Sequence, residues 1–177
     1  MLGLPTETED DVADLATLCE MVSARFPGQV TASVTPFVPK AHTPFQWVAM
    51  ASREVLENRL QKLEERFKRQ GIALKADSPK WSILQGMLAR GDRRLGRVLG
   101  SLRGNSGRSW NRAMDREDVM TDDYVRARSP EEPLPWAFIR TGVSEEYLKR
   151  EWQRAVSGSS TDPCPPDAPC SRCGVCR

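Results

Sequence analysis

The chain has 177 residues, of which 39% are hydrophobic and 28% charged, enough for one ordinary domain with an appendage. Its 26 lysines and arginines nearly balance 24 aspartates and glutamates, so the overall charge favours no class of partner. No apolar run is long enough to cross a bilayer, and no basic and apolar leader opens the chain. We therefore expect a cytoplasmic protein without a membrane partner, in a compartment where clustered cysteines more often bind metal than form disulfides.

The first fifty residues predict a strand–helix–strand unit. The opening GLPTET is typical of the end of a strand and a tight turn, so we expect the rest of that strand to lie upstream. Thr8 caps a predicted helix with apolar residues at helical spacing, and Pro27 and Gly28 end it. The alternating stretch from Val30 to Thr35 predicts a second strand, parallel to the first.

Thr31, Ser33 and Thr35 share one face of this predicted strand, because side chains alternate along a strand. A closed β/α barrel fills its lumen with branched apolar side chains. A polar face suits an open barrel that holds a polar cofactor, and equally suits an edge strand with a solvated face.

The remaining sequence predicts mostly helices. The segment from Ser52 to Gln70 has the clearest apolar stripe, and short strands are predicted at 72–75 and 136–143. Later helices are predicted at 79–91, 92–102 and 144–156. We expect residues 1–50 to form βα units, 51–156 a mostly helical extension, and 157–177 a flexible linker with a cysteine-rich tail.

From Arg90 to Arg116 the sequence has eight arginines and two aspartates. The planar fork of arginine suits bidentate contacts with phosphate or carboxylate, and Trp110 adds an aromatic plane for stacking. We expect a surface for RNA or an anionic substrate, with candidate residues Arg90, Arg93, Arg94, Arg97 and His42. The alternative is a solvated helix face paired with acidic residues elsewhere.

Four of the five cysteines lie in the last stretch, with the spacing C-x5-C-x2-C-x2-C: Cys164, Cys170, Cys173 and Cys176. In bacterial-type ferredoxins C-x2-C-x2-C places three thiolates on one cluster, whereas structural zinc usually uses two separate C-x2-C pairs. Both pairs here share Cys173, so we expect an iron–sulfur cluster, with zinc or an unmetallated tail as alternatives. Cys19, on the apolar face of the first helix, is expected to be a small buried side chain.

Four stretches, in one order, resemble a known family. They are MLGLPTETEDDV, SVTPFVPKAHTPFQW, LARGDRRLGRVL and LPWAFIRTGVSEEYLKREW. Together they resemble the C-terminal third of radical S-adenosylmethionine (SAM) proteins with an N-terminal cobalamin-binding domain, a family of unassigned substrate often encoded beside a small companion domain. The resemblance runs nearly end to end, and Ala41 departs from it where proline is expected.

The resemblance implies an α/β fold: the C-terminal remnant of a partial β/α barrel, followed by the helical extension and the cysteine-rich tail. In the full-length family it implies SAM, cobalamin and a 4Fe-4S cluster held by a C-x3-C-x2-C loop. That motif is absent from this sequence. We therefore expect a fragment of a radical SAM enzyme that is inactive without the missing N-terminal part.

The positions that match the adenosine-contacting strand ends of the family are Gly3, Glu7, Ser33 and Thr35. Gly3 and Glu7 also have simpler explanations, since turns require glycine and helix starts favour carboxylates. A function of another class stays open: an arginine-rich helical module that binds RNA or a protein partner, with zinc in its tail.

Overall fold

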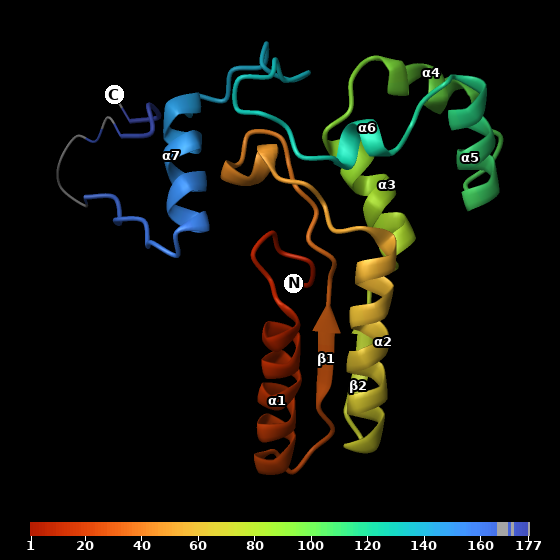
Figure 1. Ribbon diagram of the computed structural model, residues 1–177, viewed down its shortest axis with the longest axis vertical. Coiled ribbons are helices and arrows are strands. Elements are labelled where there is room, and N and C mark those ends of the chain that lie inside the picture. The colour runs from red at the N-terminus through yellow and green to blue at the C-terminus, as the bar shows by residue number, and fades with distance from the viewer. Residues whose placement is uncertain (166–169, 171, 177) are drawn as a thin grey trace. The chain divides into compact units, whose positions relative to one another are not determined.

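The computed structural model describes residues 1–165, 170 and 172–176, and the chain divides into two compact units. Unit 1 comprises Met1–Val38 and Met50–Gln85, and unit 2 comprises Pro39–Ala49 and Gly86–Arg177 (Figure 1). This division differs from the boundary expected at residue 50, because the second long helix and the strand after it belong with the first βα unit. No helix in the described residues is long and apolar enough to cross a membrane.

Unit 1 is built on parallel strands. Strand β1 (Thr31–Val34) pairs in parallel with β2 (Ala73–Ala76), and Thr31 lies opposite Ala73. On the other side of β1, Leu2 forms a parallel bridge with Pro36. The Leu2 N–H donates to the Thr35 carbonyl at 3.0 Å, and the Phe37 N–H donates to the Leu2 carbonyl at 2.7 Å. The Leu2 bridge, the following helix and β1 therefore have the parallel order expected of a strand–helix–strand unit, although Leu2 forms a single bridge and not a strand. The GLPTET turn lies beside the end of β1.

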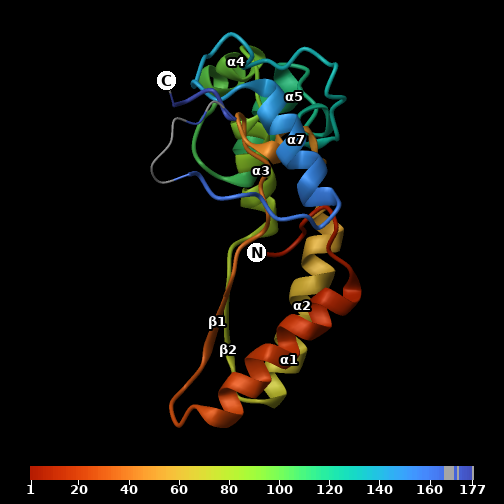
Figure 2. The same ribbon diagram turned by 90° about the vertical axis from the view of Figure 1, so that its left-hand side faces the viewer.

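Two helices connect these strands, and both lie on one side of them (Figure 2). Helix α1 (Glu9–Arg25) begins with the predicted Thr8 cap, whose hydroxyl accepts from the Asp11 N–H at 3.2 Å. The Asp11 carboxylate accepts from the Thr8 N–H at 2.7 Å, which completes a capping box. Helix α2 (Arg53–Arg69) begins at Ser52, whose hydroxyl accepts from the Val55 N–H.

The core of unit 1 lies between the strands and these helices. It consists of buried side chains from the Leu2 bridge, α1, β1, α2 and the residue before β2: Leu2, Val12, Ala16, Ala32, Val34, Leu63, Phe67 and Ile72. Cys19, expected to be buried, is partly buried and packs against this core, and burial raises the pKa of its thiol. The alternation predicted for 30–35 is confirmed, since Ala32 and Val34 are buried while Thr31 and Ser33 are exposed. The described strands do not close into a barrel, so the partial barrel stays a prediction.

Helix α3 (Pro79–Ala89) follows β2, and unit 2 contains the later helices. These later helices are α4 (Arg94–Ser101), α5 (Gly107–Arg116), α6 (Asp122–Val125) and α7 (Glu145–Val156). Unit 2 also contains the short 3-10 helix η1 (Pro44–Trp47) from earlier in the chain. The strand predicted at 136–143 is wrong, because this segment forms turns. Trp136 is buried there, and its indole N–H donates to the Gln46 side-chain oxygen at 2.7 Å. The segment is thus held by a side-chain hydrogen bond and not by the backbone hydrogen bonds of a strand.

Gly3 is required by both its backbone and its surroundings. Its φ of +87° lies in the left-handed region, and an added Cβ would lie 2.7 Å from Leu56 Cδ2 and 3.0 Å from Ala51 Cβ. Gly71, which follows α2, also has a positive φ, of +66°, but a Cβ there meets nothing within 4 Å. A substitution at Gly71 would therefore cause backbone strain alone, whereas one at Gly3 would cause backbone strain and a steric clash.

We predict that Gly3→Ala destabilises the protein more than Gly71→Ala. Both substitutions force an L-residue into the left-handed region, at roughly 1–2 kcal/mol. Gly3→Ala additionally displaces Leu56, at roughly 1–3 kcal/mol. Chemical unfolding of the two variants measures the difference, and an equal loss of stability would show that Leu56 does not press on Gly3.

Candidate functional site

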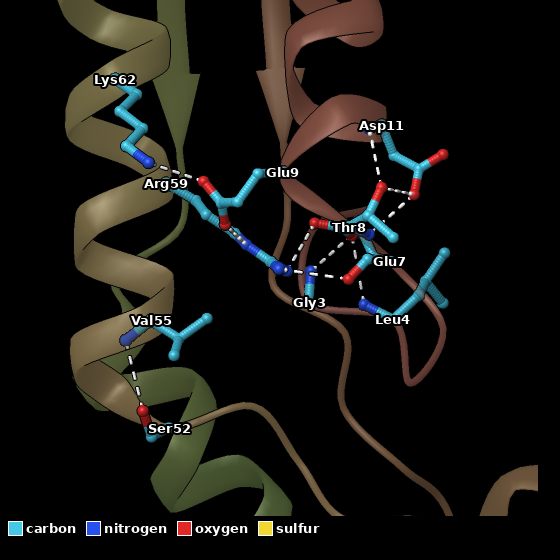
Figure 3. A network of polar contacts seen from close by, with 10 residues as sticks. All are labelled: Gly3, Leu4, Glu7, Thr8, Glu9, Asp11, Ser52, Val55, Arg59 and Lys62. Carbon is cyan, nitrogen blue, oxygen red and sulfur yellow. Dashed lines mark hydrogen bonds and ion pairs between the residues drawn. The ribbon is translucent and has the colours of Figure 1, made fainter.

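The turn after Leu2 holds two of the residues that the resemblance predicts (Figure 3). Oε2 of Glu7 accepts hydrogen bonds from the Gly3 N–H at 2.7 Å and the Leu4 N–H at 3.2 Å. These donors would otherwise be unpaired at the start of a tight turn. The Glu7 carboxylate therefore closes the turn that ends the first strand.

Arg59, from α2, binds the other side of the same carboxylate. Its Nη1 lies 2.9 Å from Glu7 Oε1, and its Nη2 donates to the Glu7 carbonyl at 3.2 Å. The side chains are 11% and 8% exposed for Arg59 and Glu7, so this ion pair is largely screened from water. The guanidinium thus joins α2 to the turn before α1.

Glu9 extends this contact toward solvent. Its carboxylate accepts from Arg59 Nε at 2.9 Å and from Lys62 Nζ at 2.6 Å. The hydrogen bonds from Lys62 and Arg59 lower the pKa of Glu9 below its usual value. We call Glu7, Glu9, Arg59 and Lys62 the carboxylate clamp (Figure 3).

Ser33 and Thr35 lie beside this turn, on the open face of the strands. Both are exposed, and Ser33 pairs in register with exposed Lys75 of β2. Because the Leu2 N–H bonds to the Thr35 carbonyl, Thr35 lies next to Gly3. Gly3 and Glu7 instead face α2, through Leu56 and Arg59, whereas Ser33 and Thr35 lie on the exposed face of the strands. The structure therefore does not place the four predicted residues on one surface. Glu7 differs from the others, because its carboxylate is already hydrogen-bonded by the turn and by Arg59.

The flank of unit 1 beside Leu2 is also uncovered. A cavity of about 300 Å³ is lined there by apolar residues, including Leu2, Leu4, Val12 and Leu15, and by the polar residues Thr6, Glu7 and Asp11. Farther along α1, Leu18 is 59% and Val22 47% exposed. By helical spacing they lie opposite the side of α1 that contacts α2 through Glu9, Ala13 and Glu20.

The arginines predicted to form an anion surface separate into two groups. Arg93, Arg94 and Arg97 line a cleft of about 840 Å³ in unit 2, together with Trp136, Phe138 and Ile139. Arg94 pairs with Asp92 at 2.9 Å, and Arg97 lies 4.0 Å from Glu117. Part of this group is thus neutralised, as the solvated-face alternative expects.

Arg90 belongs to the interior rather than to that surface. It is fully buried, and it donates to the carbonyl of Val48 at 2.8 Å and to that of Arg126 at 2.9 Å. Burial, with the nearby charges of Arg128 and Arg126, lowers the pKa of Arg90 to about 10. Its two carbonyl bonds give it a structural role in unit 2.

His42 lies in unit 2 but not among the residues that line the arginine cleft. Its backbone is left-handed, with φ of +57°, and its N–H donates to the Gln46 side chain at 3.0 Å. Its Nε2 is buried without a hydrogen-bond partner among the described residues. The geometry therefore does not join His42 to Arg93, Arg94 and Arg97.

The tail lies against α7. The Ser144 N–H donates to the Cys173 carbonyl at 2.7 Å, and Arg150 donates to the Arg172 carbonyl at 3.0 Å. Burial raises the pKa of Tyr147, and nearby Glu151, Cys173 and Cys164 raise it further.

The four tail cysteines do not converge in the described residues. Cys170 is buried, whereas Cys164 and Cys176 are exposed, and all are free thiols. No three His, Cys, Asp or Glu side chains within the described ranges are grouped to hold a metal ion. Four thiols at this spacing still suit a thiophilic metal by their chemistry, so the metal site stays a prediction.

No protein-family model matches the chain, and no solved structure matches it. Over 99 residues the chain is 32% identical to a Methanocaldococcus jannaschii protein named "Uncharacterized protein MJ0966". The match covers 56% of this chain and 22% of that protein, so it spans about a fifth of the relative's length. The relative's name states no activity, and the match assigns no family.

We predict that Arg59→Ala destabilises the protein strongly, by about 3–5 kcal/mol, because it leaves Glu7 buried without its cationic partner. Arg53→Ala is the matched control, since Arg53 is on the same helix and pairs with Glu57 at 2.6 Å in an exposed position. That loss should be far smaller, because solvent screens exposed pairs. Urea unfolding measures both, and similar losses would contradict a structural clamp.

Proposed function

We propose that this chain forms a C-terminal portion of a radical SAM enzyme and works with a portion that carries the C-x3-C-x2-C loop. The observation that carries the proposal is the parallel arrangement of Leu2, β1 and β2 with α1 and α2 on one side. Parallel sheets are normally covered on both faces. Here the other face carries exposed Thr31, Ser33, Thr35 and Lys75. A polar face of this kind suits the lumen of an open β/α barrel.

The uncovered flank of α1 supports the same proposal. In a β/α barrel each helix packs between two neighbouring helices, and α2 occupies one side of α1. The other side leaves Leu18, Met21 and Val22 exposed at spacings of three and four residues. A further βα unit placed before Leu2 would cover this apolar stripe and the nearby cavity.

In this proposal the chain's own residues orient SAM rather than activate it. Ser33 and Thr35 offer hydroxyl groups to its polar atoms, and Gly3 supplies the left-handed backbone of the turn at the strand end. Glu7 acts as a positioning residue, because its carboxylate fixes the turn that carries Gly3. The radical-generating cluster belongs to the other portion.

In the same proposal, the tail binds a metal centre through Cys164, Cys170, Cys173 and Cys176. An iron–sulfur cluster there would supply an electron-transfer group, and zinc would supply a structural one. We place the protein in the cytoplasm, where reducing conditions keep these thiols available to metal.

The DNA upstream of the Met1 codon tests the proposed enzyme directly. We expect an open reading frame, continuous with Met1 or immediately adjacent to it, that encodes a C-x3-C-x2-C motif. An upstream region that encodes no such motif, with a ribosome-binding site directly before Met1, would contradict the proposal and favour the binding-module alternative.

The tail has its own test. We predict that anaerobic incubation of the full chain with iron and sulfide gives a brown protein, and that Cys173→Ser removes the colour because both C-x2-C units share Cys173. Cys19→Ala is the control and should keep the colour, since Cys19 packs against the core of unit 1. Loss of all iron and zinc on desalting, with all four tail thiols alkylated under native conditions, would rule out the metal site.

A further inference from the structure

Another group of arginines lies on α5 and in the loop before it, in unit 2. A cavity of about 310 Å³ is lined by Arg103, Arg108, Arg112 and Arg116, together with serines that include Ser106 and Ser109. No carboxylate of the described residues lines it. We call these four arginines the α5 arginine site.

The charges of this site are not neutralised within the described part of the chain. None of the ion pairs found there involves any of the four arginines. Arg103 Nη1 contacts backbone carbonyls alone, those of Gly100 at 3.5 Å and Leu102 at 3.2 Å. By contrast, Arg59, Arg66, Arg126 and Arg128 each bind a carboxylate.

The spacing concentrates these charges on one face. Arg108, Arg112 and Arg116 follow each other at intervals of four residues, which places them in a row along α5. The row extends over about 12 Å, from the rise per residue of an α-helix. Like charges four residues apart destabilise a helix, and a bound anion would relieve this repulsion.

Hydroxyl groups complete the lining of the cavity. The Ser106 hydroxyl accepts from the Ser109 N–H at 3.2 Å, and the Ser109 hydroxyl accepts from the Arg103 N–H at 3.2 Å. Both hydroxyl oxygens act as acceptors in these bonds, which leaves their protons free for an anionic ligand. Guanidinium forks with nearby hydroxyl donors match the oxygens of a phosphate group.

We propose that the α5 arginine site binds phosphate groups of a polyanionic ligand, more than one at a time. The row of arginines is long enough for several phosphates, and no carboxylate of the described residues lines the cavity or pairs with these arginines. The phosphates can belong to a single-stranded RNA or to a small polyphosphate compound. The site uses no residue of unit 1 and no cysteine, so it does not rest on the radical SAM proposal.

The test uses the full chain with two probes, a fluorescently labelled single-stranded RNA and inorganic tripolyphosphate. Arg108→Gln combined with Arg112→Gln removes the centre of the site. Arg69→Gln combined with Arg140→Gln is the control, because these arginines are exposed, unpaired in the described residues, and equal in charge. Circular dichroism checks that helix content is unchanged, and Arg103→Gln, outside the helix, serves as a variant that leaves α5 intact.

We expect the site variant to lower affinity for tripolyphosphate at least about tenfold, and the control to change it less than about twofold. If the natural ligand is RNA, RNA affinity falls in parallel, and the slope of log affinity against log salt decreases by about 1.4 for two lost contacts. Binding of tripolyphosphate alone assigns a small polyphosphate. Equal losses in the control, or no binding of either probe, would overturn the proposal.

Discussion

The arrangement of unit 1 depends on the carboxylate of Glu7. It accepts the N–H groups of Gly3 and Leu4 on one side and the guanidinium of Arg59 on the other. One side chain therefore fixes the end of the first strand, the entry into α1 and the position of α2. The charges of Glu7 and Arg59 are tolerated in a largely buried place because each satisfies the other together with backbone groups.

This constraint explains why one face of the strands is packed and the other is open. With α1 and α2 joined through the clamp and through Arg66 and Glu20, the apolar residues of β1 meet both helices. The alternate residues Thr31, Ser33 and Thr35 then face away from the core. The parallel sheet is uncovered on one face, and the apolar stripe on α1 is exposed. Both observations support the proposal that a further βα unit packs against unit 1.

Sequence reasoning found the parts that depend on neighbouring residues. The Thr8 cap, the alternation in β1 and the left-handed Gly3 follow from local chemistry, and the structure contains each of them. Arg59 could not be found in this way, because nothing within the Ser52–Gln70 helix marks one arginine as the partner of Glu7, 52 residues away. The same limit applies to β2, whose parallel partner lies across a whole helix.

The arginine segment shows what charge counting can and cannot decide. Eight arginines against two aspartates indicated an anion surface, but burial and pairing depend on the fold. Arg90 is buried against carbonyl groups, and Arg94 is paired with Asp92. Arg108, Arg112 and Arg116, which form no ion pair within the described residues, lie one helix later, on α5. Likewise, the sequence predicts a strand at 136–143, but the segment forms turns, and the indole of Trp136 donates to Gln46, 90 residues away.

Amide hydrogen exchange measured by NMR tests the role of Glu7 most directly. We predict that the N–H groups of Leu2, Gly3 and Phe37 are protected from exchange in the native chain. We also predict that Glu7→Gln speeds the exchange of all three, because the turn and the Leu2–Pro36 bridge loosen together. Unprotected exchange of Gly3 in the native chain, or protection at Leu2 and Phe37 that survives the substitution, would contradict it.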